Sequence, residues 1–522
     1  MSNISNINIY PYTVPANIIA ISNSLPKISE IVKTLGGIYS ISPINTSKTF
    51  AKYHLFSKNI EITGRYPQFE VSVDYLEIID FNKCTYCGKC YKTCPEKCIT
   101  EELEIDFNKC TYCGKCEEAC LEKAINLNLL KSNVLKASFI LTDDKDVLND
   151  FANTPGVYHF DEINQVLSMT GDFEIEENIT HFPEICQYSG RLNYGCMRCI
   201  DTCEYNACYV KDGEIYIDYL LCESCGKCVS VCPTGAMQYL LWDDKTFIGF
   251  FKDKDVANKP LVFGTKDEIR KFQWKVEANN LEFFEIDPKY FNLLNYLFLF
   301  SIGASKVIVL NEKLKKNDEL LFANKLIQYL FNYKNFIEFN NIEDIKTNPL
   351  KNFYFNYTFD TRRKKLSFIL SFLYENSSKK DVLIEEDYLN IFGEVIVDEI
   401  KCSLCLACVN HCKIGALTAN SLKYSLNHTP SICIQCKICE KVCPEKAIKL
   451  ETGLLLSDTF FENKELYRDE PMICPSCKKE FGSRKSFEAV KEKLINSGLF
   501  EEKGAYLHYC DECRVLKLYN LK

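Results

Sequence analysis

The chain has 522 residues, a formal net charge of −9 and 47% hydrophobic residues, which predicts several globular domains with buried cores. Its 30 cysteines argue against a disulfide scaffold, because such scaffolds are short and secreted, whereas the Met1-Ser2-Asn3 start lacks the basic and apolar regions of an export signal. We therefore expect reduced, metal-binding cysteines in a cytoplasmic protein.

The first segment, residues 1–75, has the pattern of a β-α-β unit. An apolar run at 18–22 precedes helical spacing at 25–35, and Gly36-Gly37 leads into a second strand pattern. The same order recurs at 137–160, within the segment 129–185, and at 261–286, within the α/β domain and linker 243–394. Such units predict small α/β domains. No G-x-G-x-x-G or phosphate-binding loop follows these strands, so we expect scaffolds, with a bound flavin not excluded.

Residues 76–128 contain two copies of the spacing C-x2-C-x2-C-x3-C, and the sequence DFNKCTYCGKC appears at both 80–90 and 106–116. Cysteines at these intervals bind [4Fe–4S] clusters: three thiolates come from one copy and the fourth from its neighbour. The predicted ligand sets are therefore crossed: site 1 has Cys84, Cys87, Cys90 and Cys120, and site 2 has Cys94, Cys110, Cys113 and Cys116.

The middle module, residues 186–242, departs from this spacing because Asn193 stands where its first copy should begin with a cysteine. Cys186 is the preferred replacement, since a glycine-containing loop can return its thiolate to the same iron. Cys208 is the competitor, and a three-iron cluster or an iron open to an outside ligand is the remaining alternative. Cys208 is otherwise expected to be a buried packing thiol, as is Cys98. The predicted sets are Cys186, Cys196, Cys199 and Cys232 for site 3, and Cys203, Cys222, Cys225 and Cys228 for site 4.

Two stretches of residues 243–394 need separate interpretation. The apolar run 291–310 is interrupted by polar residues and by Gly303, so it predicts a buried helix followed by a buried strand and not a membrane span. Peripheral association with a membrane stays open. The basic run Arg362-Arg363-Lys364-Lys365 is expected to be a solvated surface face.

The third module, residues 395–452, has two complete copies of the spacing. Leu406 and Lys437 replace the glycine that follows the second cysteine at Gly88, Gly114 and Gly226, which predicts different packing and a different potential. Four copies are preceded by an aspartate, expected to form a turn: Asp80, Asp106, Asp218 and Asp398. The predicted ligands are Cys402, Cys405, Cys408 and Cys443 for site 5, and Cys412, Cys433, Cys436 and Cys439 for site 6.

The last segment, residues 453–522, carries a different cysteine pattern. Cys474 and Cys477 are separated by 32 residues from the pair Cys510 and Cys513, a layout typical of a tetrahedral four-cysteine site. The segment resembles a zinc ribbon. Mononuclear iron, as in a rubredoxin, is the alternative, and zinc is favoured because Lys478 and Arg514 replace the glycines usual after rubredoxin knuckles.

Each of the three modules resembles a bacterial two-cluster ferredoxin, and the chain resembles a polyferredoxin over about a third of its length. The resemblance implies an α+β multidomain fold in which three ferredoxin-like modules are separated by small α/β segments and followed by a zinc-ribbon-like domain. Six clusters at about −2 each would bring the net charge to about −21. This charge disfavours nucleic acid and favours a basic patch on a redox protein as partner.

Three functions are compatible with these features. The preferred one is an electron-transfer protein working with a low-potential partner, as similar proteins do with formate dehydrogenases and hydrogenases. The second is a redox enzyme, with catalysis at a flavin or at the irregular cluster, although no acid–base constellation is visible among the six scattered histidines. The third is a redox sensor or maturation factor whose four-cysteine tail is a binding module.

Overall fold

A computed structural model describes residues 8–152, 154–190, 193–252, 254–273, 281–341, 346–350, 361–384, 389–496 and 504–519. The chain divides into two compact units, one formed by Ile9–Glu176 and the other extending from Glu177 to Lys522. The first unit contains one of the three cysteine-rich modules, and the second contains the other two together with the four-cysteine tail.

The first unit is built on a seven-stranded sheet with the order β10-β9-β2-β3-β5-β6-β8. Its parallel part consists of two β-α-β units, which confirms both predictions of this pattern. These are β2 (Asn17–Ser22), α1 (Leu25–Leu35) and β3 (Ser40–Asn45), and then β9 (Phe139–Thr142), α4 (Lys145–Asp150) and β10 (Val157–His159).

Segments 1–75 and 129–185, which were predicted as separate α/β segments, thus contribute strands to the same sheet. β2 pairs in parallel with β9, so that Ile18 lies opposite Phe139. Both strands are buried along their lengths, as expected for central parallel strands that are covered on both faces. Continuous apolar runs predict such strands, but they do not say which strand lies beside which.

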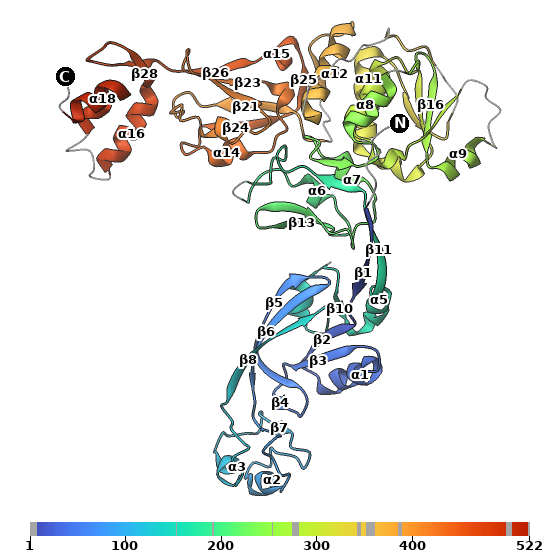
Figure 1. Cartoon of the computed structure of the whole chain (residues 1–522), viewed down its shortest axis with the longest axis vertical. Helices are drawn as coiled ribbons and strands as arrows, with labels where there is room; N and C mark the ends of the chain where they lie inside the picture. The colour runs from blue at the N-terminus through green and yellow to red at the C-terminus, as the bar shows by residue number, and fades with distance from the viewer. Residues whose placement is uncertain are drawn as a thin grey trace. The chain divides into compact units, whose positions relative to one another are not determined.

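The first cysteine-rich module is an insertion into the antiparallel part of this sheet. β6 (Gln68–Leu76) pairs with β5 (Leu55–Arg65) and with β8 (Leu130–Ala137), and the β6–β8 register ends with Leu76 opposite Leu130. The chain therefore leaves the sheet and returns to it at adjacent points (Figure 1). The other elements of the unit are β4 (Thr49–Phe50), α2 (Lys89–Thr93), β7 (Ile105–Asp106), α3 (Lys115–Glu118), α5 (Ile163–Ser168), and the paired strands β1 (Asn8–Val14) and β11 (Gly171–Glu177).

The second unit contains a four-stranded parallel sheet of order β17-β16-β18-β19. The β-α-β unit predicted at 261–286 consists of β16 (Pro260–Gly264), α9 (Lys266–Gln273) and β17 (Glu282–Glu285), while 274–280 lie outside the described residues. The remaining elements are α8 (Asp244–Lys252), α10 (Leu293–Ser301), β18 (Lys306–Val309), α11 (Asp318–Phe331), β19 (Ile337–Phe339) and α12 (Arg362–Asn376).

The apolar run 291–310 forms α10 and β18, and every residue of both elements is buried. Asn292 caps α10 by accepting hydrogen bonds from the amides of Leu294 and Asn295. The predicted helix–strand interpretation is confirmed. Among the described residues, no helix combines the length and the apolar character needed to cross a bilayer.

Two further modules of similar design belong to this unit, and in each a pair of short helices lies in contact. The middle module has β12 (Ile179–His181), α6 (Arg198–Asp201), β13 (Cys208–Lys211), β14 (Glu214–Ile217), α7 (Lys227–Ser230) and β15 (Met237–Tyr239). The third module and its surroundings have β20 (Val382–Ile384), β21 (Gly393–Val397), α13 (Ala407–Asn410), β22 (Leu417–Asn420), β23 (Ser425–His428), α14 (Ile438–Val442), β24 (Ile448–Thr452), β25 (Leu454–Leu456), α15 (Asp458–Phe461) and β26 (Lys464–Arg468).

The prediction that the basic run 362–365 is solvent-exposed is wrong. Arg362 is 3% exposed and Arg363 is 0% exposed. Arg362 is buried because its guanidinium pairs with Asp244, with Nε 2.9 Å from Oδ2 and Nη2 3.0 Å from Oδ1. Arg363 is buried with its guanidinium carbon 4.3 Å from the centre of the Phe392 ring. These residues begin α12, from which Leu366, Ile369, Leu370, Leu373 and Tyr374 are buried in the large core of the unit.

The tail consists of the hairpin β27 (Pro471–Ile473) and β28 (Glu480–Ser483), followed by α16 (Arg484–Asn496) and α18 (Asp511–Leu518). α16 has no buried residue. A small cluster in the tail is formed by Cys474, Cys510 and Cys513, with Phe481 and Tyr509 packed against it. This small core is therefore dominated by sulfur atoms.

Candidate metal centres

The four aspartates that precede the cysteine loops form turns, as predicted. A carboxylate oxygen of each accepts a hydrogen bond from the backbone amide two residues later, at 2.9–3.1 Å. The turns therefore fix the direction in which the chain enters each loop. The carboxylates concerned are those of Asp80, Asp106, Asp218 and Asp398.

In the first module, the structure gathers the eight predicted ligands around two cavities. One cavity is lined by the site 1 cysteines, Cys84, Cys87, Cys90 and Cys120. The other is lined by the site 2 cysteines, Cys94, Cys110, Cys113 and Cys116. Each cavity thus combines three cysteines of one copy with the fourth cysteine of the other, the crossed arrangement that two [4Fe–4S] clusters require.

Backbone amides point at several of these sulfurs. The amide of Tyr112 lies 3.4 Å from the Cys110 sulfur, and that of Ala124 lies 3.2 Å from the Cys120 sulfur. Hydrogen bonds of this kind stabilise thiolate charge and tune the potential of a bound cluster. Gly88 adopts a φ of +73°, and a Cβ there would come within 2.7 Å of the Tyr91 ring, so glycine fits this turn without displacing Tyr91.

The middle module brings Cys186 to the position that Asn193 leaves without a thiol. A cavity is lined by the four site 3 cysteines, Cys186, Cys196, Cys199 and Cys232, and also by Arg198. The backbone amide of Tyr188 lies 3.4 Å from the sulfur of Cys186, which is two residues earlier in the chain. The amide of Tyr112 makes the same contact with the sulfur of Cys110. Cys186 therefore has the local geometry of the first cysteine in a regular copy. Its side chain is 6% exposed, which suits a ligand shielded from water.

Cys208 belongs to the surroundings of site 4. It is buried, as predicted, and it forms side-chain hydrogen bonds with Cys203 and Cys228. The hydrogen bond from Cys208 is the largest of the effects that lower the pKa of Cys203, to about 5. Cys98 is likewise buried, with its sulfur 3.4 Å from that of Cys94. Both extra thiols thus lie beside predicted ligand sets as neighbours that can donate a hydrogen bond.

In the third module, the eight predicted ligands all belong to one apolar cluster or pack against it, apart from the exposed Cys405. Burial raises the pKa of Cys408 to about 12, and the neighbouring charges of Cys402, Cys405 and Cys443 add to this shift. These four are the site 5 set. Burial also raises the pKa of Cys439, and the next causes are the charges of Cys433, Cys436 and Cys412, which complete the site 6 set.

Leu406 and Lys437 keep the backbone conformation of the glycines that they replace. Their φ angles are +60° and +62°, against +74° for Gly114. The left-handed conformation costs a residue with a Cβ about 1–2 kcal/mol, and the rest of the loop sustains it here. The predicted difference in packing therefore concerns the side chains, while the backbone turn is the same.

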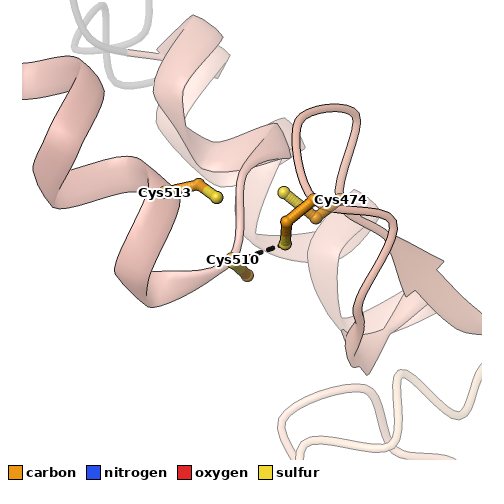
Figure 2. Close-up of side chains that lie close together, drawn as sticks. Cys474, Cys510 and Cys513 are labelled. Atoms are coloured by element: carbon orange, nitrogen blue, oxygen red, sulfur yellow. Dashed lines mark hydrogen bonds between the residues drawn. The ribbon is translucent and has the colours of Figure 1, made fainter. Parts of the chain in front are cut away.

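The four tail cysteines form a compact group whose sulfurs all lie within 4.8 Å of one another. Figure 2 shows Cys474, Cys510 and Cys513 gathered between the hairpin turn and the start of α18. The sulfur of Cys477 is 3.6 Å from that of Cys510. The second pair is not in a second hairpin, since Cys510 immediately precedes α18, where the positive end of the helix dipole favours thiolates.

The tail cysteines differ in pKa: that of Cys474 is lowered, whereas the hydrogen bond with Cys477 raises that of Cys513 to about 12. Although burial raises the pKa of Cys474, backbone amides of Cys477, Cys510 and Ser476 outweigh burial and lower this pKa to about 6. A thiolate that forms so readily is a good metal ligand. Four sulfurs at these separations fit a tetrahedral ion such as Zn²⁺, with no further ligand needed.

Replacing both Cys474 and Cys477 by serine is expected to release about one zinc ion per chain without bleaching the visible absorbance of the iron–sulfur sites. The reason is that the tail cysteines belong to none of the six crossed sets. Metal analysis combined with visible spectra tests this, with Ser476→Ala as the control that keeps all four sulfurs. Loss of iron from the double variant would contradict the separation of the tail from the modules.

Two protein-family models match cysteine-rich parts of the chain. A 4Fe-4S dicluster domain matches residues 76–121, and a 4Fe-4S binding domain matches residues 215–238 and 427–449. These ranges contain all eight cysteines of sites 1 and 2 and the second copy of each later module. The chain is therefore an iron–sulfur protein of the ferredoxin type. No curated protein matches it.

The sequence interpretation missed the buried arginines of α12. Arg362 Nη1 donates hydrogen bonds to the carbonyl oxygens of Val229 and Cys232, at 2.6 and 2.7 Å, and so holds the loop that ends site 3. A signal for this burial was present, because helical spacing places Arg362 and Arg363 on the face that carries Leu366, Ile369 and Leu370.

Proposed function

We propose that the chain binds six [4Fe–4S] clusters and one zinc ion and transfers single electrons between low-potential redox partners in the cytoplasm. The observation that carries this proposal is the crossing of ligand sets between the two cavities of the first module. When bound, each cluster accepts and releases one electron, commonly at low potential. The cysteine loops contribute the thiolates, the amide hydrogen bonds to sulfur and the exclusion of water.

The nature of the partner is also part of the proposal. The net charge of −9 becomes more negative when thiolates bind clusters, which favours docking to a basic patch on another redox protein. A formate dehydrogenase, a hydrogenase or a related anaerobic oxidoreductase fits this description. Cys87, Cys113 and Cys405 are exposed, so sites 1, 2 and 5 each have a cysteine that a partner can approach.

Anaerobically prepared protein is expected to contain about 24 iron atoms, about 24 acid-labile sulfides and about one zinc ion per chain. A reductive titration followed by EPR spectroscopy should then show up to six one-electron reductions, and the reduced chain should pass its electrons to an artificial acceptor. Iron near 16 per chain would remove one module from the proposal. Turnover of formate, hydrogen or a nicotinamide cofactor by the isolated, flavin-free chain would contradict this proposal and identify the protein as an enzyme.

A further inference from the structure

The middle and third modules meet at two of their cysteine sites. Cys196 of site 3 packs against the apolar cluster that contains the core of the third module. A Cβ on Gly195 would lie 3.1 Å from the Cδ1 atom of Ile438, next to a site 6 cysteine. Sites 3 and 6 are therefore direct neighbours.

Polar contacts hold this junction together. Lys413 Nζ donates hydrogen bonds across it to the carbonyl oxygens of Ser189, at 2.6 Å, and Pro183, at 3.4 Å. The Tyr194 hydroxyl donates to the carbonyl oxygen of Lys437 at 3.5 Å, and the Lys441 ammonium lies 5.5 Å from the centre of the Tyr194 ring. Ser189, Tyr194 and Gly195 all lie between Cys186 and Cys196. The loop that connects the replacement ligand Cys186 to the rest of site 3 therefore also forms the junction.

One helix contacts both modules beside the junction. Arg362 donates to the Cys232 carbonyl in the middle module, and Ser367 Oγ, further along α12, lies 2.8 Å from Ser431 Oγ in the third module. α12 is therefore hydrogen-bonded to both modules that meet at the junction.

The cysteine sites of the two modules form a series of neighbours. Cys199 of site 3 and Cys228 of site 4 belong to one apolar cluster, and Cys439 of site 6 and Cys408 of site 5 belong to another. The contact between Cys196 and the second cluster joins the two pairs. We propose that sites 4, 3, 6 and 5, in that order, form one continuous path for electrons, in which the step between sites 3 and 6 crosses the junction of the two modules.

This inference rests on the proposed function, because it assumes that the sites hold clusters. Each step moves one electron: the site that gives it is oxidised by one electron, the next site is reduced by one, and no proton or atom is transferred. A one-electron donor protein supplies the first electron, and an acceptor protein removes it at the other end. The exposed Cys405 makes site 5 the end that is open to solvent.

Magnetic coupling between reduced clusters tests the order of the sites in the full chain. After complete reduction with dithionite, EPR spectra are expected to show four pairwise couplings: one within each of the three modules and one across the junction. Only three couplings in a chain that contains about 24 iron atoms would overturn the path while leaving the electron-transfer function intact. Failure of the sites to take up iron or electrons would instead contradict the proposed function.

A matched pair of variants assigns the fourth coupling to the junction. Tyr194→Ala/Lys413→Ala removes polar contacts between the modules without touching a cysteine, and it is expected to lose the fourth coupling while iron content and the other three couplings persist. Tyr216→Ala/Lys449→Ala changes two exposed residues of the same two modules and should keep all four. Loss of the fourth coupling from the control as well, or its persistence at full strength in the first variant, would overturn the assignment.

Discussion

Replacing Cys186 by serine is expected to remove one cluster from the middle module and to leave the other five in place. Iron should fall from about 24 to about 20 atoms per chain, because four iron atoms belong to site 3. Cys186 lines the same cavity as Cys196, Cys199 and Cys232, and serine offers a harder oxygen ligand than the thiolate that the cluster binds. Iron and sulfide analysis of the anaerobic protein, with EPR spectra of the reduced state, measures the loss.

Cys208→Ser is the matched control for this substitution. Cys208 is also a buried thiol of the middle module, 4% exposed, but it lies beside Cys203 and Cys228 and does not line the site 3 cavity. A serine hydroxyl can still donate a hydrogen bond at this position, so iron should stay near 24 atoms per chain. An exchange of the two outcomes, with iron lost from Cys208→Ser alone, would transfer the ligand role from Cys186 to Cys208.

Replacing Arg362 by methionine is expected to lower the free energy of unfolding of the second unit by about 3–5 kcal/mol, because it leaves the buried carboxylate of Asp244 without its partner. Burial raises the pKa of Asp244, but the charge and hydrogen bonds of Arg362 outweigh this and hold the pKa below its ordinary value. The pair therefore stabilises the fold at pH values above the ordinary aspartate pKa, and this contribution is lost as the pH falls through the lowered one. Urea denaturation followed by circular dichroism measures the effect.

Two further variants show whether the loss comes from the ion pair. Lys364→Met removes a positive charge from the same turn of α12, but Lys364 is only partly buried, so stability should change little. Arg362→Met/Asp244→Asn removes both charges and should recover part of the loss, because no unpaired charge is then buried. Equal denaturation midpoints for Arg362→Met and Lys364→Met would contradict the role given to the pair.

Local patterns predicted the elements that local chemistry determines. The β-α-β units, the turn-forming aspartates and the helix and strand at 291–310 depend on short-range periodicity and on side chains that bond to their own backbone. The cysteine spacing likewise predicted which sulfurs line the cavities of the first module, because it resembles that of two-cluster ferredoxins, in which the fourth cysteine of each copy binds the other cluster. The placement of Cys186 followed from a missing thiol and a nearby glycine, and the amide of Tyr188 gives that placement a geometric reason.

Long-range contacts were beyond the same reasoning. The pairing of β2 with β9 joins Ile18 to Phe139 across more than a hundred residues, and no pattern within either strand specifies its neighbour. The ion-pair partner of Arg362 is Asp244, which lies far away in sequence, so the pair could not be predicted, although the helical spacing of α12 already favoured burial of Arg362. The start of a helix at Cys510 was likewise not predicted, because two cysteines with two residues between them are compatible with a hairpin turn or with a helix start.

The strand pair β6–β8 brings the two ends of the first module together, while the pairing of β4 with β7 and the packing of Phe56 hold the module against its host. Leu76 and Leu130 lie opposite each other, so the spacing of the two ends is set by the sheet whatever the chain between them contains. Insertions at closely spaced ends cost little chain entropy and leave the core of the host intact. On the proposed function, deletion of this module would remove two clusters together while leaving β6 and β8 able to pair.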